Sequence, residues 1–114
     1  MSADISVIIV DDSKQFRDSV RTMLEFEKGI TVSGEAGDGS EAVELARKLK
    51  PDVILMDVNM PGMDGISATK AILAELSANV VIVSVQAESD YLRRAMQAGA
   101  RDYLVKPFGY DELV

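Results

Sequence analysis

Short apolar runs alternate along the chain with longer segments in which apolar residues recur at helical spacing. The runs have the length of strands and predict them at residues 5–10, 31–35, 53–56, 80–83 and 102–105. Apolar strands that alternate with amphipathic helices are typical of a parallel sheet covered on both faces. We therefore expect an α/β fold of five βα units, of which the last has barely begun at Val114.

Polar residues and helix breakers mark the ends of the predicted helices. Ser13 or Asp12 can cap the first helix, and Gly29 is expected to end it. Asp38 followed by Glu41 is a variant of the capping box and predicts the start of the second helix. In the last predicted helix, residues 88–98, the apolar side chains expected to be buried are Leu92, Ala95 and Met96.

Chemically useful side chains follow four of the predicted strands. The first strand ends at Asp11 and Asp12, the third at Asp57, the fourth at Ser84 and the last at Lys106. Ligands of an open parallel sheet bind beyond the carboxyl ends of its strands, where the winding reverses. A strand order of 2-1-3-4-5 would bring all three carboxylates together. Carboxylates, a hydroxyl and an ammonium at one sheet edge predict a Mg²⁺-dependent site that accepts a phosphoryl group.

The composition of the chain excludes several classes of protein. A chain of 114 residues can bury a single core, and we expect one domain over residues 1–114. The chain has no cysteine, which excludes disulfides and thiolate metal sites. A net charge of −7 repels nucleic acid, and no apolar run is long enough for a membrane helix. Because the first residues do not resemble a signal peptide, we expect a cytoplasmic domain without direct contact to nucleic acid or membrane.

The strand-end residues, in this order, resemble the receiver domain of bacterial two-component response regulators. The resemblance runs from Ile5 to about Leu113 and includes the loop 60–65, Ala98-Gly99-Ala100 and Lys106-Pro107-Phe108. It implies a flavodoxin-like (βα)₅ fold, doubly wound around a parallel sheet of order 2-1-3-4-5. Since the chain stops one turn into the fifth helix, and a single turn does not persist alone, we expect it to be part of a longer regulator.

The resemblance also implies a role for each acidic residue of the site. Asp57 is expected to be the residue that a sensor histidine kinase phosphorylates. Asp12 and Asp57 would bind Mg²⁺ directly and Asp11 mainly through water, with the backbone carbonyl of Asn59 as a further ligand. Catalysis would be limited to the chain's own phosphoryl transfer and dephosphorylation.

Residues near the ends of the last two strands are expected to respond to the phosphoryl group. Lys106 would supply a positive charge to it and Ser84 a hydroxyl, with the peptide bond between Lys106 and Pro107 expected to be cis. Tyr103 would change rotamer as Ser84 moves. Val85 stands where the family most often has alanine or glycine, and its branched side chain is expected to slow small phosphodonors.

The change at Tyr103 would be read on the face formed by the last predicted helix, the last strand and the start of the following helix. Partners implied by the resemblance are a sensor histidine kinase or phosphotransfer protein and an attached or separate effector domain. A second copy of the chain is also expected to bind through this face, by reciprocal charge pairs of Arg93, Arg94 and Arg101 with Asp102, Asp111 and Glu112. The main alternative is a pseudo-receiver, an interaction module that regulates an effector without phosphorylation. Its hallmark is the loss of an acidic or lysine position, and none is lost here.

Two further alternatives share features of the chain. A haloacid-dehalogenase-type phosphatase also uses an aspartate at a strand end, but it requires a second acid where this chain has Asn59. A flavin-binding protein of the same fold requires a phosphate loop rich in hydroxyl groups where this chain has Asp11 and Asp12. The active receiver is therefore the interpretation that the sequence favours.

Overall fold

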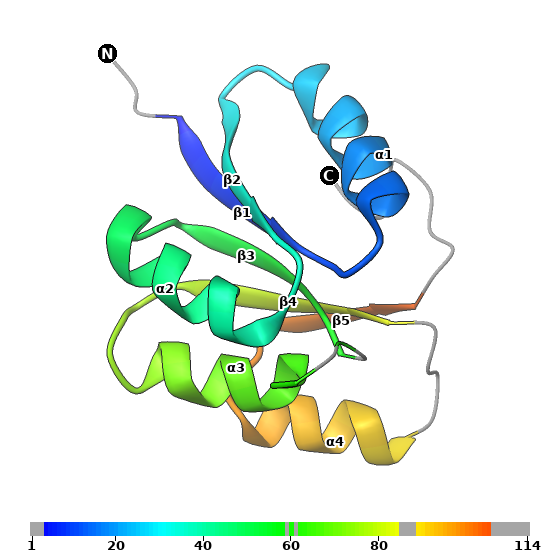
Figure 1. Ribbon diagram of the computed structural model, residues 1–114, viewed down its shortest axis with the longest axis vertical. Helices are drawn as coiled ribbons and strands as arrows, with labels where there is room; N and C mark the ends of the chain where they lie inside the picture. Colours follow the sequence, from blue (N-terminus) through cyan, green and yellow to red (C-terminus); the bar gives the residue numbers. More distant parts are fainter. Residues whose placement is uncertain (1–3, 59, 61, 85–88, 106–114) are drawn as a thin grey trace.

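The computed structural model describes residues 4–58, 60, 62–84 and 89–105. Strands and helices alternate along these residues (Figure 1): β1 (Ile5–Val10), α1 (Lys14–Glu25), β2 (Ile30–Ala36), α2 (Gly39–Leu49), β3 (Val53–Asp57), α3 (Gly65–Leu73), β4 (Asn79–Ser84), α4 (Ser89–Gln97) and β5 (Asp102–Val105). The five predicted strands and the helices predicted between them are confirmed, with small shifts at the ends, whereas the predicted start of a fifth helix lies outside the described residues. Within the described residues, no helix is long and apolar enough to cross a membrane.

The strands form one parallel sheet of order β2-β1-β3-β4-β5, as expected. The chain first adds β2 on one side of β1 and then crosses to the other side for β3. The reversal of the winding therefore lies between β1 and β3. A ligand site is expected beyond the carboxyl ends of these two strands.

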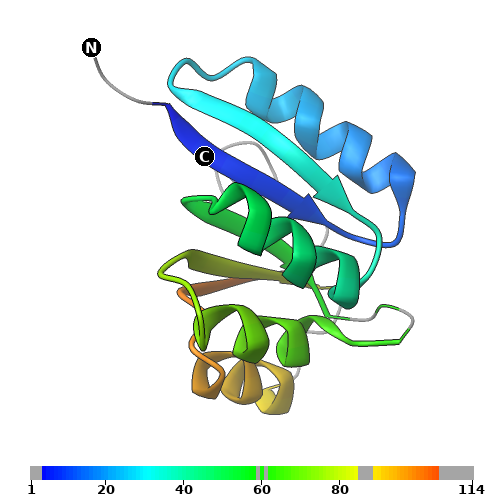
Figure 2. The same ribbon diagram turned by 60° about the vertical axis from the view of Figure 1, so that its left-hand side comes forward.

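Helices cover both faces of the sheet (Figure 2). On one face α1 packs against inward-facing strand residues, and this core comprises Val7, Ile9, Val20, Leu24, Leu55 and Val83. On the other face α2, α3 and α4 pack against the alternate strand residues, which include Ile8, Val10, Ile54, Met56, Val80 and Ile82. Because both sides of the central strands are buried, their sequences are almost continuously apolar instead of alternating.

The first helix begins as predicted but ends earlier. Ser13 is its N-cap, since the Ser13 hydroxyl accepts a hydrogen bond from the backbone amide of Phe16 at 3.2 Å. The helix ends before its C-cap residue, Phe26, so the prediction that Gly29 ends it was wrong. Gly29 instead adopts a φ of 88° in the turn that leads to β2, and its carbonyl accepts from the amide of Ile5 at 2.7 Å. The glycine serves the turn, where a positive φ is required.

The capping box of α2 is confirmed in a variant form. The Asp38 carboxylate accepts from the backbone amide of Glu41 at 2.8 Å. The Glu41 carboxylate accepts in return from the amide of Gly37 at 2.6 Å, one residue earlier than in the standard box. The two bonds fix the path of the chain from β2 into α2.

The burial predicted for α4 was correct only in part. Ala95 is fully buried, but Leu92 and Met96 are 44% and 45% exposed, so the prediction that both are buried was wrong. The helix meets the core through Tyr91, Ala95 and Ala98. These residues follow one another at helical spacing, and Leu92 and Met96 lie on the adjacent stripe, which faces outward.

The start of α3 lies close against the end of β3, and glycine makes this approach possible. A Cβ atom placed on Gly65 would lie 1.8 Å from the backbone oxygen of Asp57 and 2.7 Å from its carbonyl carbon. The Gly65 amide also donates to the carbonyl of Val58 at 2.9 Å. Any side chain at this position would have to displace the backbone at the end of β3.

We expect Gly65→Ala to lower the free energy of unfolding by about 2 kcal/mol, because the added methyl group overpacks a backbone contact. Gly37→Ala is the control, since a Cβ there would meet its nearest neighbours at 3.7 and 3.9 Å, an ordinary contact distance. It should change stability by no more than about 0.5 kcal/mol. Urea unfolding of both variants measures the difference, and equal stabilities would contradict this account of Gly65.

Candidate functional site

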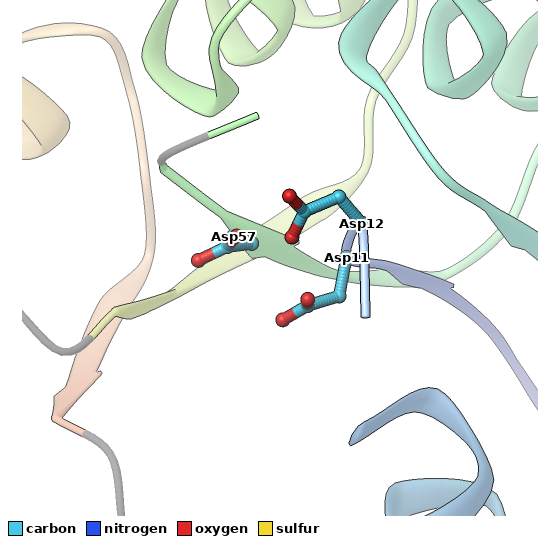
Figure 3. A group of neighbouring side chains, drawn as sticks. All are labelled: Asp11, Asp12 and Asp57. Atoms are coloured by element: carbon cyan, nitrogen blue, oxygen red, sulfur yellow. The ribbon is translucent and has the colours of Figure 1, made fainter. Parts of the chain in front are cut away.

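The register between β1 and β3 decides which side chains meet beyond the sheet. Val10 pairs with Met56, so the residues that follow them, Asp11 and Asp57, leave the two strands side by side. Figure 3 shows Asp11 and Asp12 where β1 ends and Asp57 at the end of β3. Carboxylate oxygens of the three residues all lie within 4.8 Å of one another. The structure thus brings together the three aspartates that the sequence singled out.

The three carboxylates differ in exposure. Asp11 and Asp57 are only 1% and 6% exposed, whereas Asp12 is open to solvent. Carboxylates held this close, with two of them largely removed from water, repel one another, so this geometry favours a cation beside them. Oxygen donors suit a hard divalent ion such as Mg²⁺, which binds one or two carboxylates and keeps several waters.

The turn that carries Asp11 and Asp12 is held by hydrogen bonds on several sides. The Asp11 amide donates to the carbonyl of Ala36 at 3.0 Å, and the Asp11 carboxylate accepts from the amide of Ser13 at 2.8 Å. The Asp11 carbonyl accepts a short hydrogen bond from Nη1 of Arg17. Arg17 was not predicted to be a site residue, although its place one turn after the N-cap, Ser13, could have suggested a contact with the turn.

Described residues of the loop after Asp57 contact the two neighbouring helices. The Asp64 carboxylate caps α3 by accepting from the amide of Ser67 at 2.8 Å. At the other side of the loop, a Cβ atom on Gly39 would lie 2.4 Å from the backbone oxygen of Met63. Gly39, the first residue of α2, therefore contacts the loop that follows Asp57.

Ser84 lies on β4, which pairs with β3, and Tyr103 lies on β5, the edge strand beyond β4. Asp57 pairs with Val83 across β3 and β4, and Ser84 is the next residue and fully buried. Tyr103 on β5 pairs with Ile82 and is partly buried against the core shared with α2, α3 and α4. Their positions are compatible with a relay from the sheet edge toward α4, and the relay itself stays a prediction.

Several residues to which the sequence assigned roles lie outside the described part of the chain. These are Asn59, the proposed carbonyl ligand, Val85, and Lys106 with the adjoining Pro107. Their contacts with the acidic cluster, and the cis peptide bond, remain predictions.

Comparisons with known proteins agree with this site and fold. Residues 7–114 match the response regulator receiver domain family. The transcriptional regulatory protein PdtaR of Mycobacterium tuberculosis is 44% identical over 108 residues, which cover 95% of this chain and 52% of PdtaR. The response regulator GacA of Pseudomonas aeruginosa is 43% identical over 111 residues, with 96% and 52% covered. The chain thus spans about half the length of these relatives.

A solved structure extends the similarity to three dimensions. The signal receiver domain of the response regulator NarL from Mycobacterium tuberculosis superposes with a TM-score of 0.95 at 36% identity, covering 99% of this chain and 92% of that domain. The sheet order, the aspartates at the ends of β1 and β3, and these matches agree with one another. The chain belongs to the family of response regulator receiver domains.

Proposed function

We propose that this chain is a phospho-accepting switch of a two-component system and that Asp57 receives the phosphoryl group. The observation that carries the proposal is the convergence of three carboxylates, within 4.8 Å, at the point where the sheet reverses its winding. Two of the relatives, PdtaR and GacA, are named as a transcriptional regulatory protein and a response regulator. A signalling role is in keeping with both names.

The donor set of the site fits Mg²⁺, the ion inferred from the sequence. In this proposal Asp12 and Asp57 bind the ion directly, Asp11 binds it through water, and the carbonyl of Asn59 completes the protein ligands. Bound Mg²⁺ would supply positive charge to the phosphoryl oxygens. The exposure of Asp12 gives the ion a route to the site from solvent.

Asp57 is the nucleophile in the proposed reaction. One of its carboxylate oxygens attacks the phosphorus atom of a phosphohistidine on the partner protein. The new P–O bond forms as the P–N bond of the donor breaks, and the electron pair of the broken bond remains on the histidine nitrogen. Lys106 and the Ser84 hydroxyl donate to the other phosphoryl oxygens. Attack by water on the same phosphorus atom later restores the free carboxylate.

The output of the switch is proposed to pass from Ser84 and Tyr103 to the surface of α4 and β5. On that surface Leu92 and Met96 offer apolar contact area, because both are nearly half exposed. A sensor histidine kinase or phosphotransfer protein would deliver the phosphoryl group. An effector domain, or a second copy of the chain bound through this surface, would read the change.

Asp57 is expected to be the residue that accepts the phosphoryl group. Incubation with acetyl phosphate or phosphoramidate and Mg²⁺ should add one phosphate to the wild-type chain, measured as intact mass. Asp57→Asn should abolish the addition, because an amide cannot act as the nucleophile. The control is Asp18→Asn, at an exposed aspartate of α1 that pairs with Lys14, and it should be labelled like the wild type. Labelling of Asp57→Asn would refute the site, and an unlabelled wild type would favour the pseudo-receiver.

Bound Mg²⁺ is expected to stabilise the folded chain. Mg²⁺ at ten times its dissociation constant should raise the free energy of unfolding by about 1.4 kcal/mol, since only the folded chain assembles the site. Asp12→Ala should reduce this gain, because it removes a direct ligand. In EDTA the substitution should not lower stability, because Asp12 is exposed and its removal relieves repulsion with Asp11 and Asp57. Urea unfolding with Mg²⁺ and with EDTA measures both effects, and an undiminished gain in Asp12→Ala, compared with Asp18→Ala, would contradict the assignment of Asp12.

A further inference from the structure

A basic residue of α1 reaches the turn that carries two of the three aspartates. Nη1 of Arg17 donates to the backbone carbonyl of Asp11. This carbonyl belongs to the peptide unit that joins Asp11 to Asp12. The orientation of that peptide unit decides how the backbone passes from Asp11, whose carboxylate is buried, to Asp12, whose carboxylate is exposed.

The Arg17 side chain is itself held in place by the neighbouring strand. Its Nε donates to Oε1 of Glu35 at 3.0 Å, and Nε of Arg21 donates to the other carboxylate oxygen of Glu35 at 2.6 Å. The Arg17 and Glu35 side chains are only 18% and 23% exposed, so solvent and salt screen this pair less than a surface ion pair. Glu35, which anchors Arg17, lies on β2 opposite Ile9 of β1, so the pairing of these two strands fixes its position.

The two contacts of Arg17 require a guanidinium group. One nitrogen of the planar fork binds Glu35 and another binds the Asp11 carbonyl. Lysine carries the same charge on a single nitrogen at the end of a flexible stem, and it cannot reproduce both contacts with one fixed geometry. Arg17→Lys therefore separates the charge of the residue from its bridging geometry.

We propose that Arg17, anchored by Glu35, is a positioning residue for the metal site. It holds the peptide between Asp11 and Asp12 in the direction that turns both carboxylates toward Asp57. The inference rests on the proposed Mg²⁺-dependent function and adds a residue that does not touch the ion. Together with the bonds from Ser13 and to Ala36, the Arg17 contact fixes Asp11 at its carbonyl, its carboxylate and its amide.

A role of Arg17 through its charge and a role through positioning predict different changes in Mg²⁺ affinity when Arg17 is replaced. A nearby positive charge disfavours a divalent cation, so a role through charge alone predicts tighter Mg²⁺ binding when the charge is removed, and no change when lysine preserves it. A positioning role predicts weaker binding even when the charge is preserved. The direction of the change in affinity therefore distinguishes the two.

The test is the Mg²⁺ dissociation constant of the whole chain, measured by NMR titration of backbone amides. Arg17→Lys should raise it about tenfold, as is typical when a residue that supports metal ligands is lost. Arg21→Lys is the matched control. Arg21 lies on the same helix as Arg17 and also donates to Glu35, but its described hydrogen bonds do not include one to Asp11. The dissociation constant of Arg21→Lys should stay within about twofold of the wild type.

Glu35→Asp provides an independent variant, because it keeps the negative charge but shortens the side chain that anchors Arg17. It should raise the dissociation constant in the same direction as Arg17→Lys but by less, whereas a role through charge alone predicts no change. If Arg17→Lys fails to fold, as judged by urea unfolding in EDTA, Glu35→Asp carries the test. For either variant, the Mg²⁺ concentration that gives half-maximal phosphorylation should rise, while the rate at saturating Mg²⁺ should stay near that of the wild type.

An Arg17→Lys chain that folds and binds Mg²⁺ as tightly as the wild type, or more tightly, would overturn the positioning role. So would an unchanged affinity in Glu35→Asp when it carries the test. In these cases the wild type still binds Mg²⁺ and accepts phosphate, and the proposed function stands. A wild-type chain that binds no Mg²⁺ would instead refute the proposed function, and the positioning role with it.

Discussion

Burial of negative charge at the edge of an apolar sheet is the constraint on which the rest of the structure depends. Asp11 and Asp57 lie almost entirely out of water and within 4.8 Å of each other and of Asp12. Such an arrangement is destabilising by itself, because like charges in a poorly solvated place repel strongly. The fold offsets this with a large core on each face of the sheet, and both buried acids lie at the same edge of it.

Backbone contacts, and not contacts between the aspartate side chains, place the three aspartates of the site. The pairing of Val10 with Met56 places the two buried acids side by side, and a slip of one residue would turn the side chains of β3 to the opposite face. Gly65 allows α3 to approach the carbonyl of Asp57, and Gly39 allows α2 to approach the loop beyond it. Two helices on the same face of the sheet therefore contact the backbone at and after Asp57.

Most of the fold could be predicted because each central strand is buried on both faces and is therefore a continuous apolar run. The winding and the three aspartates followed from the family resemblance and from the position of each acid at a strand end. Leu92 and Met96 were assigned wrongly because α4 carries two adjacent apolar stripes, and only the packing of Tyr91, Ala95 and Ala98 shows which one faces the core. Arg17 was missed because its partner, Glu35, lies 18 residues further along the chain, and no local pattern identifies that pairing.

The distance along the chain between the two halves of the site has a consequence for how the protein folds. β1 and β3 are neighbours in the sheet, but α1, β2 and α2 lie between them in the sequence. Pairing these strands closes a long loop, a step with a high entropic cost that is typically slow. During synthesis, β1 and both of its acids leave the ribosome well before Asp57 does. The three carboxylates can therefore meet only after this loop has closed, and partly folded chains in which β1 and β3 are unpaired lack the complete acidic cluster.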